Sequence, residues 1–319
     1  MRTIQLLAIA LLLCTGITSV QAQQLSLFTQ YREQNTIVNP AAVSSDFLAF
    51  GHNASFGASY RVQWADFAGA PRTQVLRGEY MTTDFSTNLL VGGHLINDQT
   101  GPTGFTGFYG RLAGVISGDP EYNGISLGIT AGAVQYGIRT DELVLKDEND
   151  ITAAGAQGQT HPDVGVGVYA YTYLDSGRDG GYLYGGVSVP QLLGLDLNFQ
   201  DANGDFLLKR VRHFYGNIGF MQFLRDDSFL EPSIWVKYVP NAPINVDVNL
   251  RYQFAQNLWI GTGVSTAKNA HVEAGLLVGD NVSYSRNLKI GYGFDYSFSS
   301  FGPFVGATHE VNLAFSFAN

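Results

Sequence analysis

Apolar and polar residues alternate along much of the chain, most regularly in its C-terminal third. Between 244 and 254 every second residue is apolar, and the positions between them hold Asn245, Asp247, Asn249, Arg251 and Gln253. Strict alternation places the two sets on opposite faces of a β-strand. The pattern returns at 258–264, 272–278, 288–298 and 311–317. These segments are close in length to the tilted strands that cross a membrane, which take about 9–11 residues.

Further strands are expected upstream, where clusters of Gly, Pro, Asn and Asp separate the apolar runs. They fall at 47–60, 72–83, 88–98, 103–116, 123–138, 163–175, 181–189, 211–225 and 228–239. With the C-terminal segments they make about fourteen strands, so the pattern predicts an all-β fold, a transmembrane antiparallel up-and-down β-barrel over residues 47–319. A soluble β-sandwich would alternate too, but its outward faces would be richly charged. Here the non-apolar faces carry Gly, Ser, Asn and Tyr with scattered charges, which suits a packed lumen.

The composition agrees with this prediction, because 38 Gly, 17 Tyr and 21 Phe accompany only 14% charged residues. Such a bias is typical of turns and aromatic-rich strands. The formal net charge of -9 comes without a basic stripe that could neutralise phosphates, which argues against a nucleic-acid partner. Aromatic residues near the proposed strand ends predict girdles at the two membrane interfaces. They are Tyr60, Trp64, Tyr136, Tyr173, Tyr182, Tyr238, Tyr252, Trp259 and Tyr284.

The N-terminus reads as a secretory signal peptide at residues 1–22, with cleavage after Ala22. Its apolar run from Ile4 to Cys14 is too short for a spanning helix, which takes about 20 residues. Export combined with the strand pattern predicts an integral protein of the outer membrane, in contact with its lipid. Residues 23–46 are polar and precede the first clear strand, so we expect them to enter or cover the lumen as a plug.

If the apolar faces meet lipid, several charged side chains of the C-terminal strands point into the lumen. They are Asp247, Arg251, Glu273, Lys289, Asp295 and Glu310. Both signs occur on neighbouring strands. We therefore expect these groups to neutralise one another around lumenal water or the plug, rather than to line an ion-selective path.

The motifs of catalytic and metal sites are missing or incomplete. No G-x-S-x-G is present, and Leu313 stands where a zinc-protease motif starting at His309 needs its second His. The stretch 201–205 resembles the start of a calcium loop, but a hairpin turn on Asn203-Gly204 fits it better, and the acidic stretch 141–150 reads as a solvated loop. No enzyme activity, catalytic residue, cofactor or metal is predicted. A lipid hydrolase with a Ser–His pair stays open as an alternative, with the candidates His52, His94, His213 and His271.

Several short sequence elements follow one another along the chain in a set order. Asn39-Pro40-Ala41 is followed by Arg61, Gln63 and Trp64 within 60–64 and then by Gly69-Ala70-Pro71. Near the C-terminus stand Asp295 within 290–296 and His309-Glu310 shortly after Gly306. In this order and spacing the elements resemble the PorP/SprF-like outer-membrane proteins of Bacteroidetes, which are associated with type IX secretion and gliding motility. The resemblance covers nearly the whole chain after the signal peptide.

The resemblance implies a barrel that works with type IX secretion components. It would dock or anchor a secreted surface protein, an adhesin or an enzyme with a C-terminal sorting domain, through protein contacts. For the motif residues it implies a structural role or a partner contact. Asn39-Pro40 would break the incoming segment, Trp64 would anchor at a membrane interface, and Gly69-Ala70-Pro71 would form a turn. The alternatives are an outer-membrane porin or transporter of hydrophobic compounds, and the lipid hydrolase.

Overall fold

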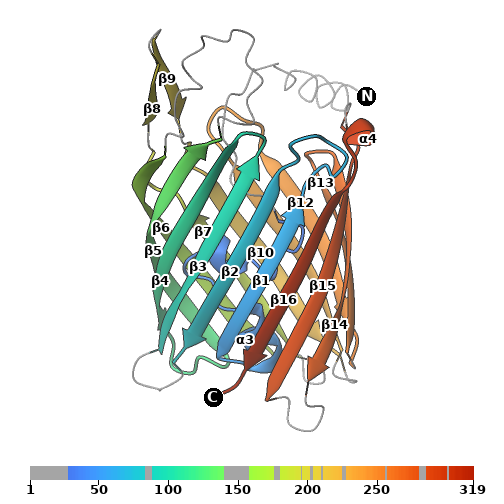
Figure 1. Cartoon of the computed structure of the whole chain (residues 1–319). Helices are drawn as coiled ribbons and strands as arrows, with labels where there is room; N and C mark the ends of the chain where they lie inside the picture. The colour runs from blue at the N-terminus through green and yellow to red at the C-terminus, as the bar shows by residue number, and fades with distance from the viewer. Residues whose placement is uncertain are drawn as a thin grey trace, which may run out of the picture.

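A closed antiparallel barrel of fourteen strands forms the body of the molecule in a computed structural model (Figure 1). The structure describes residues 28–82, 88–139, 158–175, 180–194, 196–201, 204–209, 211–224, 228–255, 257–279, 285–299 and 302–319. Neighbours in sequence pair around the wall, and β1 closes it against β16. The predicted all-β barrel fold and its number of strands are confirmed.

The barrel strands lie close to their predicted positions. They are β1 (Ala54–Val62), β2 (Arg72–Met81), β3 (Asn88–Thr100), β4 (Thr103–Ile116), β5 (Asn123–Ile138), β6 (Gln159–Leu174), β7 (Gly181–Val189), β10 (Phe214–Phe223), β11 (Phe229–Tyr238), β12 (Asn245–Gln253), β13 (Leu258–Ser265), β14 (Asn269–Gly279), β15 (Arg286–Ser297) and β16 (Thr308–Phe317). Outside the wall, β8 (Asp196–Asp201) and β9 (Gly204–Lys209) form a separate hairpin. The expected hairpin is present, because Asp201 of β8 pairs with Gly204 of β9, whereas Asn203 of the predicted turn lies outside the described residues.

The prediction for the start of the barrel was wrong by several residues. Instead of a strand from 47, the chain forms the helix α3 (Ser45–Phe50), and β1 begins only at Ala54. Ser44 caps α3 by accepting a hydrogen bond from the Asp46 backbone N–H. Gly51, in the left-handed conformation with φ 70°, ends it. The capping signals therefore outweighed the apolar run that suggested a strand.

The two faces of the wall have the polarity that the alternation predicts. On β12, Val248 and Leu250 are 49% and 46% exposed on the outside, whereas Asp247 and Arg251 are each 4% exposed on the inside. An apolar exterior around a polar interior is the arrangement of an outer-membrane barrel. Among the described residues, none of the helices is both long enough and apolar enough to span a membrane.

The predicted aromatic girdles are only partly correct. Tyr60 and Tyr238 face outward and are 42% and 41% exposed. Trp259 and Tyr136 instead point into the lumen and are buried, and the Arg251 guanidinium lies 3.7 Å from the centre of the Trp259 ring. The alternation itself accounts for this, because the outward positions of β13 are the neighbours of Trp259. Tyr284, the signal peptide and the acidic stretch 141–150 lie outside the described residues.

The two ends of the barrel differ in their connections. At one end they are uniformly short: 82–87, 117–122, 175–180, 224–228, 254–257 and 280–285. At the other end lie the long connections 63–71, 139–158, 190–213 and 298–307. Outer-membrane barrels have short periplasmic turns and longer extracellular loops. We therefore call the first the periplasmic end and the second the outer mouth. The C-terminus lies at the periplasmic end, and α4 (Gly302–Val305) and the β8–β9 hairpin lie at the outer mouth (Figure 1).

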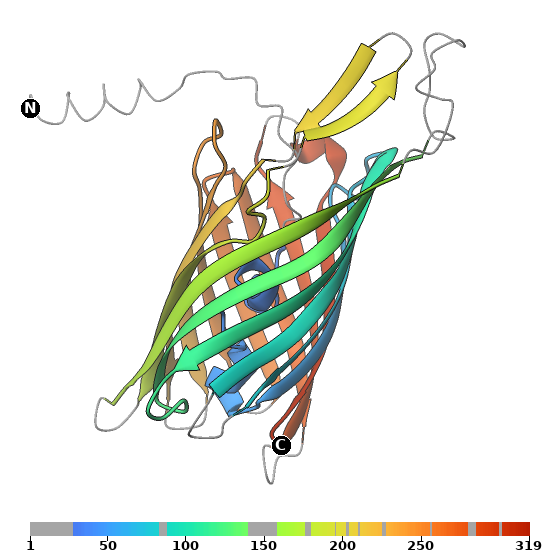
Figure 2. The same ribbon diagram turned by 90° about the vertical axis from the view of Figure 1, so that its left-hand side faces the viewer.

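Residues 28–53, here called the lumenal segment, lie inside the barrel (Figure 2). The segment contains α2 (Asn35–Val38) and α3. It starts near the outer mouth, where the Thr29 hydroxyl donates to Asp295 at the end of β15. It finishes at the periplasmic end, where Asn53 bonds the Asn319 backbone N–H at 2.9 Å. The chain therefore passes down through the lumen before it enters the wall at β1.

Candidate functional site

Glu33 of the lumenal segment lies at the centre of a buried ion cluster. Its carboxylate oxygens lie 2.6 Å from Lys289 Nζ and 3.2 Å from Arg251 Nη1. Arg32 and Arg77 approach it to 3.4 Å and 3.7 Å. These four cations surround a single buried carboxylate. Glu33 is therefore ionised inside the barrel.

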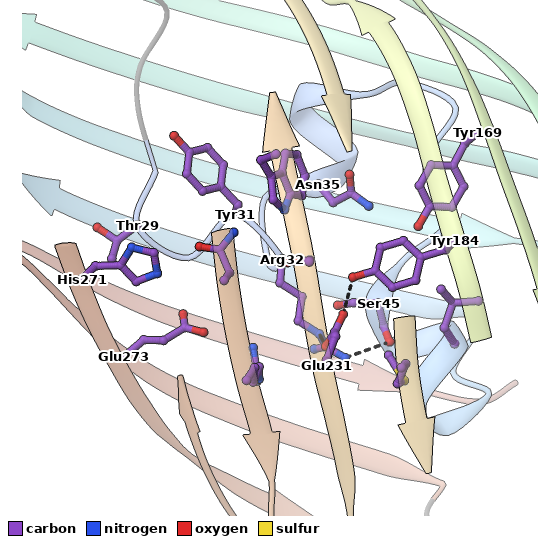
Figure 3. A pocket seen from close by; sticks show the side chains of 16 residues that line it. Thr29, Tyr31, Arg32, Asn35, Ser45, Tyr169, Tyr184, Glu231, His271 and Glu273 are labelled. Atoms are coloured by element: carbon purple, nitrogen blue, oxygen red, sulfur yellow. Dashed lines mark hydrogen bonds and ion pairs between the residues drawn. The ribbon is translucent and has the colours of Figure 1, made fainter. Parts of the chain in front are cut away.

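Carboxylates from the wall and from α3 balance these cations. Arg32 Nε lies 2.5 Å from Glu231 Oε2, and the Tyr184 hydroxyl donates to the other oxygen of Glu231 at 2.5 Å. Figure 3 shows Arg32, Tyr184 and Glu231 converging beside the lumenal segment. Lys289 Nζ also lies 2.5 Å from Asp46 Oδ1 in α3. Buried ions are tolerated only when they are paired, so each member of the cluster depends on the others.

The Asn39-Pro40-Ala41 element follows α2 and is bound directly to the wall. Asn39 Nδ2 donates to the Val168 carbonyl of β6 at 3.1 Å. Arg111 of β4 donates to the Pro40 carbonyl at 2.6 Å and also to the Ala42 carbonyl. The same guanidinium lies 2.6 Å from Glu79 of β2. One arginine thus holds both the backbone of the segment and a wall carboxylate.

Glycines on three neighbouring strands let this element approach the wall. Gly128 of β5 and Gly167 of β6 are cross-strand partners, and Gly186 lies on β7. A Cβ at Gly128 would collide with the Pro40 carbonyl, and a Cβ at Gly167 or Gly186 would collide with the Asn39 side chain. Glycine is the residue that permits such close backbone approach. We call these three residues the glycine seat.

Near the outer mouth a second cluster joins residues from both ends of the sequence. Arg61 Nε lies 3.7 Å from Glu310, and Arg61 Nη2 lies 3.8 Å from Asp295. Arg61 Nη1 also donates to Gln63 at 3.0 Å. Glu310, which is fully buried, accepts the Thr29 backbone N–H at 2.6 Å. Four of the residues singled out in the sequence, Arg61, Gln63, Asp295 and Glu310, therefore meet at one place.

Of the remaining motif residues, Trp64 borders that cluster. With φ 57°, it lines a cavity of about 40 Å³ at the outer mouth together with Arg61, Gln63 and Asp295. Gly69, with φ 77°, lies with Ala70 and Pro71 in the connection from β1 to β2. His309 faces the outside of the barrel, where its Nδ1 lies 2.6 Å from the Tyr292 hydroxyl.

The charged residues assigned to the lumen fall into the two clusters or beside them. Arg251 and Lys289 contact Glu33, and Asp295 and Glu310 contact Arg61. Asp247 lies 2.6 Å from Lys237, whose ammonium also donates to the Tyr31 hydroxyl. Glu273 lines a further cavity of about 40 Å³ (Figure 3). Cavities of this size hold only a few water molecules.

Sequence reasoning missed several members of the central cluster: Arg32, Glu33, Asp46, Arg77, Glu79, Arg111 and Glu231. For the wall residues a signal existed. Arg77 and Glu79 share the inward face of β2 with buried Val75 and Met81. For Glu33 the sequence holds no periodic signal, because the lumenal segment is largely irregular.

The histidines proposed for a Ser–His pair are placed as follows. His52 Nδ1 lies 2.9 Å from Ser316 Oγ, and both residues are buried, at 1% and 0% exposure. His94 stacks on Tyr109, with ring centres 4.7 Å apart. His213 Nδ1 lies 2.9 Å from a backbone carbonyl, and His271 lies 4.0 Å from Asp295. In the described part of the chain, no three His, Cys, Asp or Glu residues are grouped to hold a metal ion.

Comparisons with known proteins agree with this architecture. Residues 20–315 match the family described as type IX secretion system membrane protein PorP/SprF. No curated protein sequence matches the chain. The CymD monoaromatic hydrocarbon channel is 10% identical and superposes with a TM-score of 0.55, over 92% of this chain and 94% of that one. A TodX deltaS2S3 mutant monoaromatic hydrocarbon channel is 8% identical, with a TM-score of 0.52 over 88% and 93%.

Both likenesses concern the fold alone, since the identities are so low. The family match is of a different kind, because it spans most of the sequence and includes every element whose order and spacing carried the resemblance. The chain is an outer-membrane β-barrel and belongs to the PorP/SprF family of type IX secretion system membrane proteins.

Proposed function

We propose that this barrel docks or anchors a secreted surface protein, an adhesin or an enzyme with a C-terminal sorting domain, through protein contacts. Membership of the PorP/SprF family associates the barrel with type IX secretion. The partner would bind loops and rim rather than pass through the barrel.

The observation that carries this proposal is the packing of the lumenal segment. It runs from the outer mouth to the periplasmic end and is held along its length by paired charges and hydrogen bonds to the wall. A lumen occupied in this way favours a role as a plugged scaffold over a role as a conduit. Deleting residues 28–50 and measuring single-channel conductance tests this step: the deletion variant should form pores that the full chain does not. Equal conductance of the two would contradict it.

The outer mouth offers exposed aromatic side chains for a protein contact. Phe304 in α4 is 83% exposed and Phe67 is 54% exposed. Their two connections are joined by a hydrogen bond of 3.1 Å from Asp66 N–H to the Val305 carbonyl. Exposed aromatic residues are enriched among the anchors of protein interfaces.

Affinity purification of the barrel from the outer membrane, followed by identification of the recovered proteins, tests the docking role. Recovery of a surface protein with a C-terminal sorting domain supports it, and Phe304→Ser should lower that recovery. The matched control is Tyr122→Ser at the periplasmic end, where the aromatic ring is 55% exposed. Repeated absence of any type IX component from the wild-type sample would refute the proposal.

The alternatives make different predictions. A porin or transporter of hydrophobic compounds would give large, stable conductance or uptake with the full chain. A lipid hydrolase would release fatty acids from outer-membrane lipid. Hydrolysis needs a nucleophile that substrate can reach, and the burial of both His52 and Ser316 disfavours it.

A further inference from the structure

A polar hollow lies on the outside of the wall, near the outer mouth. Its volume is about 350 Å³, within the range of about 300–1,000 Å³ that is usual for small-ligand sites. The polar side chains that line it are Asn97, Gln99, Thr106, Gln135 and Arg139. We call it the outer-wall hollow. It is separate from the lumen, because Asn97 alternates with the buried, inward-facing Ile96 on β3.

The pairing of β3, β4 and β5 builds the hollow in two rows. Asn97, Thr106 and Gln135 are cross-strand partners and form a row of amides and a hydroxyl. In the next row toward the outer mouth, Gln99 of β3 pairs with Gly104 of β4, and Gly104 pairs with Gly137 of β5. The two glycines leave the space open, and a Cβ at Gly137 would meet no atom within 4 Å.

The row on the membrane side of the hollow is apolar. It consists of Leu95, Phe108 and Ala133, which are again cross-strand partners. Leu95 and Phe108 are 43% and 64% exposed. On an outer-membrane barrel such outward apolar side chains meet acyl chains. The hollow therefore lies where the outward surface changes from apolar to polar, at the level of lipid head groups.

The lining chemistry suits a ligand rich in hydroxyl groups. Amides and hydroxyls both donate and accept hydrogen bonds, as sugar hydroxyls require. Arg139 is the one cation among the described lining residues, and it could bind a single acidic group of the ligand. A simple phosphate head group would be better served by several cations. We propose that the outer-wall hollow binds the saccharide head group of an outer-leaflet glycolipid, whose acyl chains lie against the apolar row.

Binding of purified lipopolysaccharide to the full-length protein in phospholipid nanodiscs tests this proposal. The wild-type protein should bind it more tightly than it binds added phosphatidylglycerol. Gly137→Phe, which fills the hollow, should weaken binding about tenfold or more, and Arg139→Ala should weaken it about tenfold, the cost of one charge-assisted hydrogen bond.

Two matched controls separate the site from general effects. Gly114→Phe adds the same ring at another glycine of the outer wall whose Cβ would meet no atom within 4 Å. Arg212→Ala removes another exposed arginine. Arg212 donates to the Leu192 carbonyl at 2.9 Å, much as Arg139 donates to the Gly101 carbonyl at 2.8 Å. Both control variants should bind as the wild type does.

Unchanged binding by Gly137→Phe would overturn the proposal, provided that the variant keeps the heat-modifiable electrophoretic mobility of a folded barrel. Equal affinity of the wild type for lipopolysaccharide and phosphatidylglycerol would overturn it too. Equally tight binding of the delipidated oligosaccharide would refute the contribution assigned to the apolar row. None of these results bears on the docking role.

Discussion

At the scale of single residues, the ionised Glu33 carboxylate is the centre on which the lumenal charges converge. Replacing it by Gln keeps the shape but leaves Lys289, Arg251, Arg77 and Arg32 with one carboxylate fewer. Breaking a buried ion cluster on one side costs about 3–5 kcal/mol. We expect Glu33→Gln to lower the free energy of unfolding by about this amount, measured by urea titration in lipid vesicles. Glu121→Gln, at an exposed position, is the control. Equal stability of the two variants would refute the central role of Glu33.

Whether the sequence predicts a contact of a single residue depends on how far apart along the chain the two interacting residues lie. The inward direction of Asp247 and Arg251 is local, because it depends only on alternation along β12. The pairing of Glu33 with Lys289 joins residues 256 positions apart. No pattern within the lumenal segment encodes that distance. Alternation therefore predicts which charges of the C-terminal strands face inward, but it does not predict that Arg251 and Lys289 meet Glu33.

At the scale of elements, the glycine seat fits the Asn39-Pro40-Ala41 element to β5, β6 and β7. Gly167→Ala adds a Cβ that collides with the Asn39 side chain and Pro40. We expect this variant to loosen the lumenal segment and so to raise single-channel conductance and protease sensitivity. Gly110→Ala is the control, because the nearest atom to its Cβ would be 3.8 Å away. If the Gly167→Ala barrel stays closed and protease-resistant, the glycine seat is not needed to hold the lumenal segment against the wall.

The elements themselves were predictable to different degrees. Long alternating strands such as β12 and β15 were expected nearly at their observed bounds, because one face contacts lipid and the other the lumen. The helix α3 was not, since its apolar residues Phe47 and Leu48 pack inside the barrel rather than against lipid. An apolar run of that length fits a strand or a helix equally well until its surroundings are known.

At the scale of the whole molecule, the path of the lumenal segment predicts where the mature N-terminus emerges. Phe28 lies at the outer mouth, and five residues after Ala22, spanning about 18 Å at most, connect it to the expected cleavage site. A peptide tag inserted after Ala22 should bind antibody on intact cells. The same tag after Asn319, at the periplasmic end, should bind only in permeabilised cells. Detection of the N-terminal tag solely after permeabilisation would contradict this path.

The barrel architecture was largely predictable from the sequence because membrane and lumen impose opposite polarities on alternate residues throughout the wall. The direction of the lumenal segment was not, because it follows from contacts at both ends. Thr29 bonds Glu310 near the start of β16, and His52 contacts Ser316 near its end.

The closing seam of the wall has a consequence for biogenesis. The lumenal segment leads straight into β1, and β1 is the strand that pairs with β16 to shut the barrel. The segment carries buried charges that contact strands all around the wall, so threading it through a finished barrel would strip those ions of their partners. We therefore expect the wall to close around a lumenal segment that is already in place. A barrel that assembles in this order would have no open lumen at any stage of its insertion.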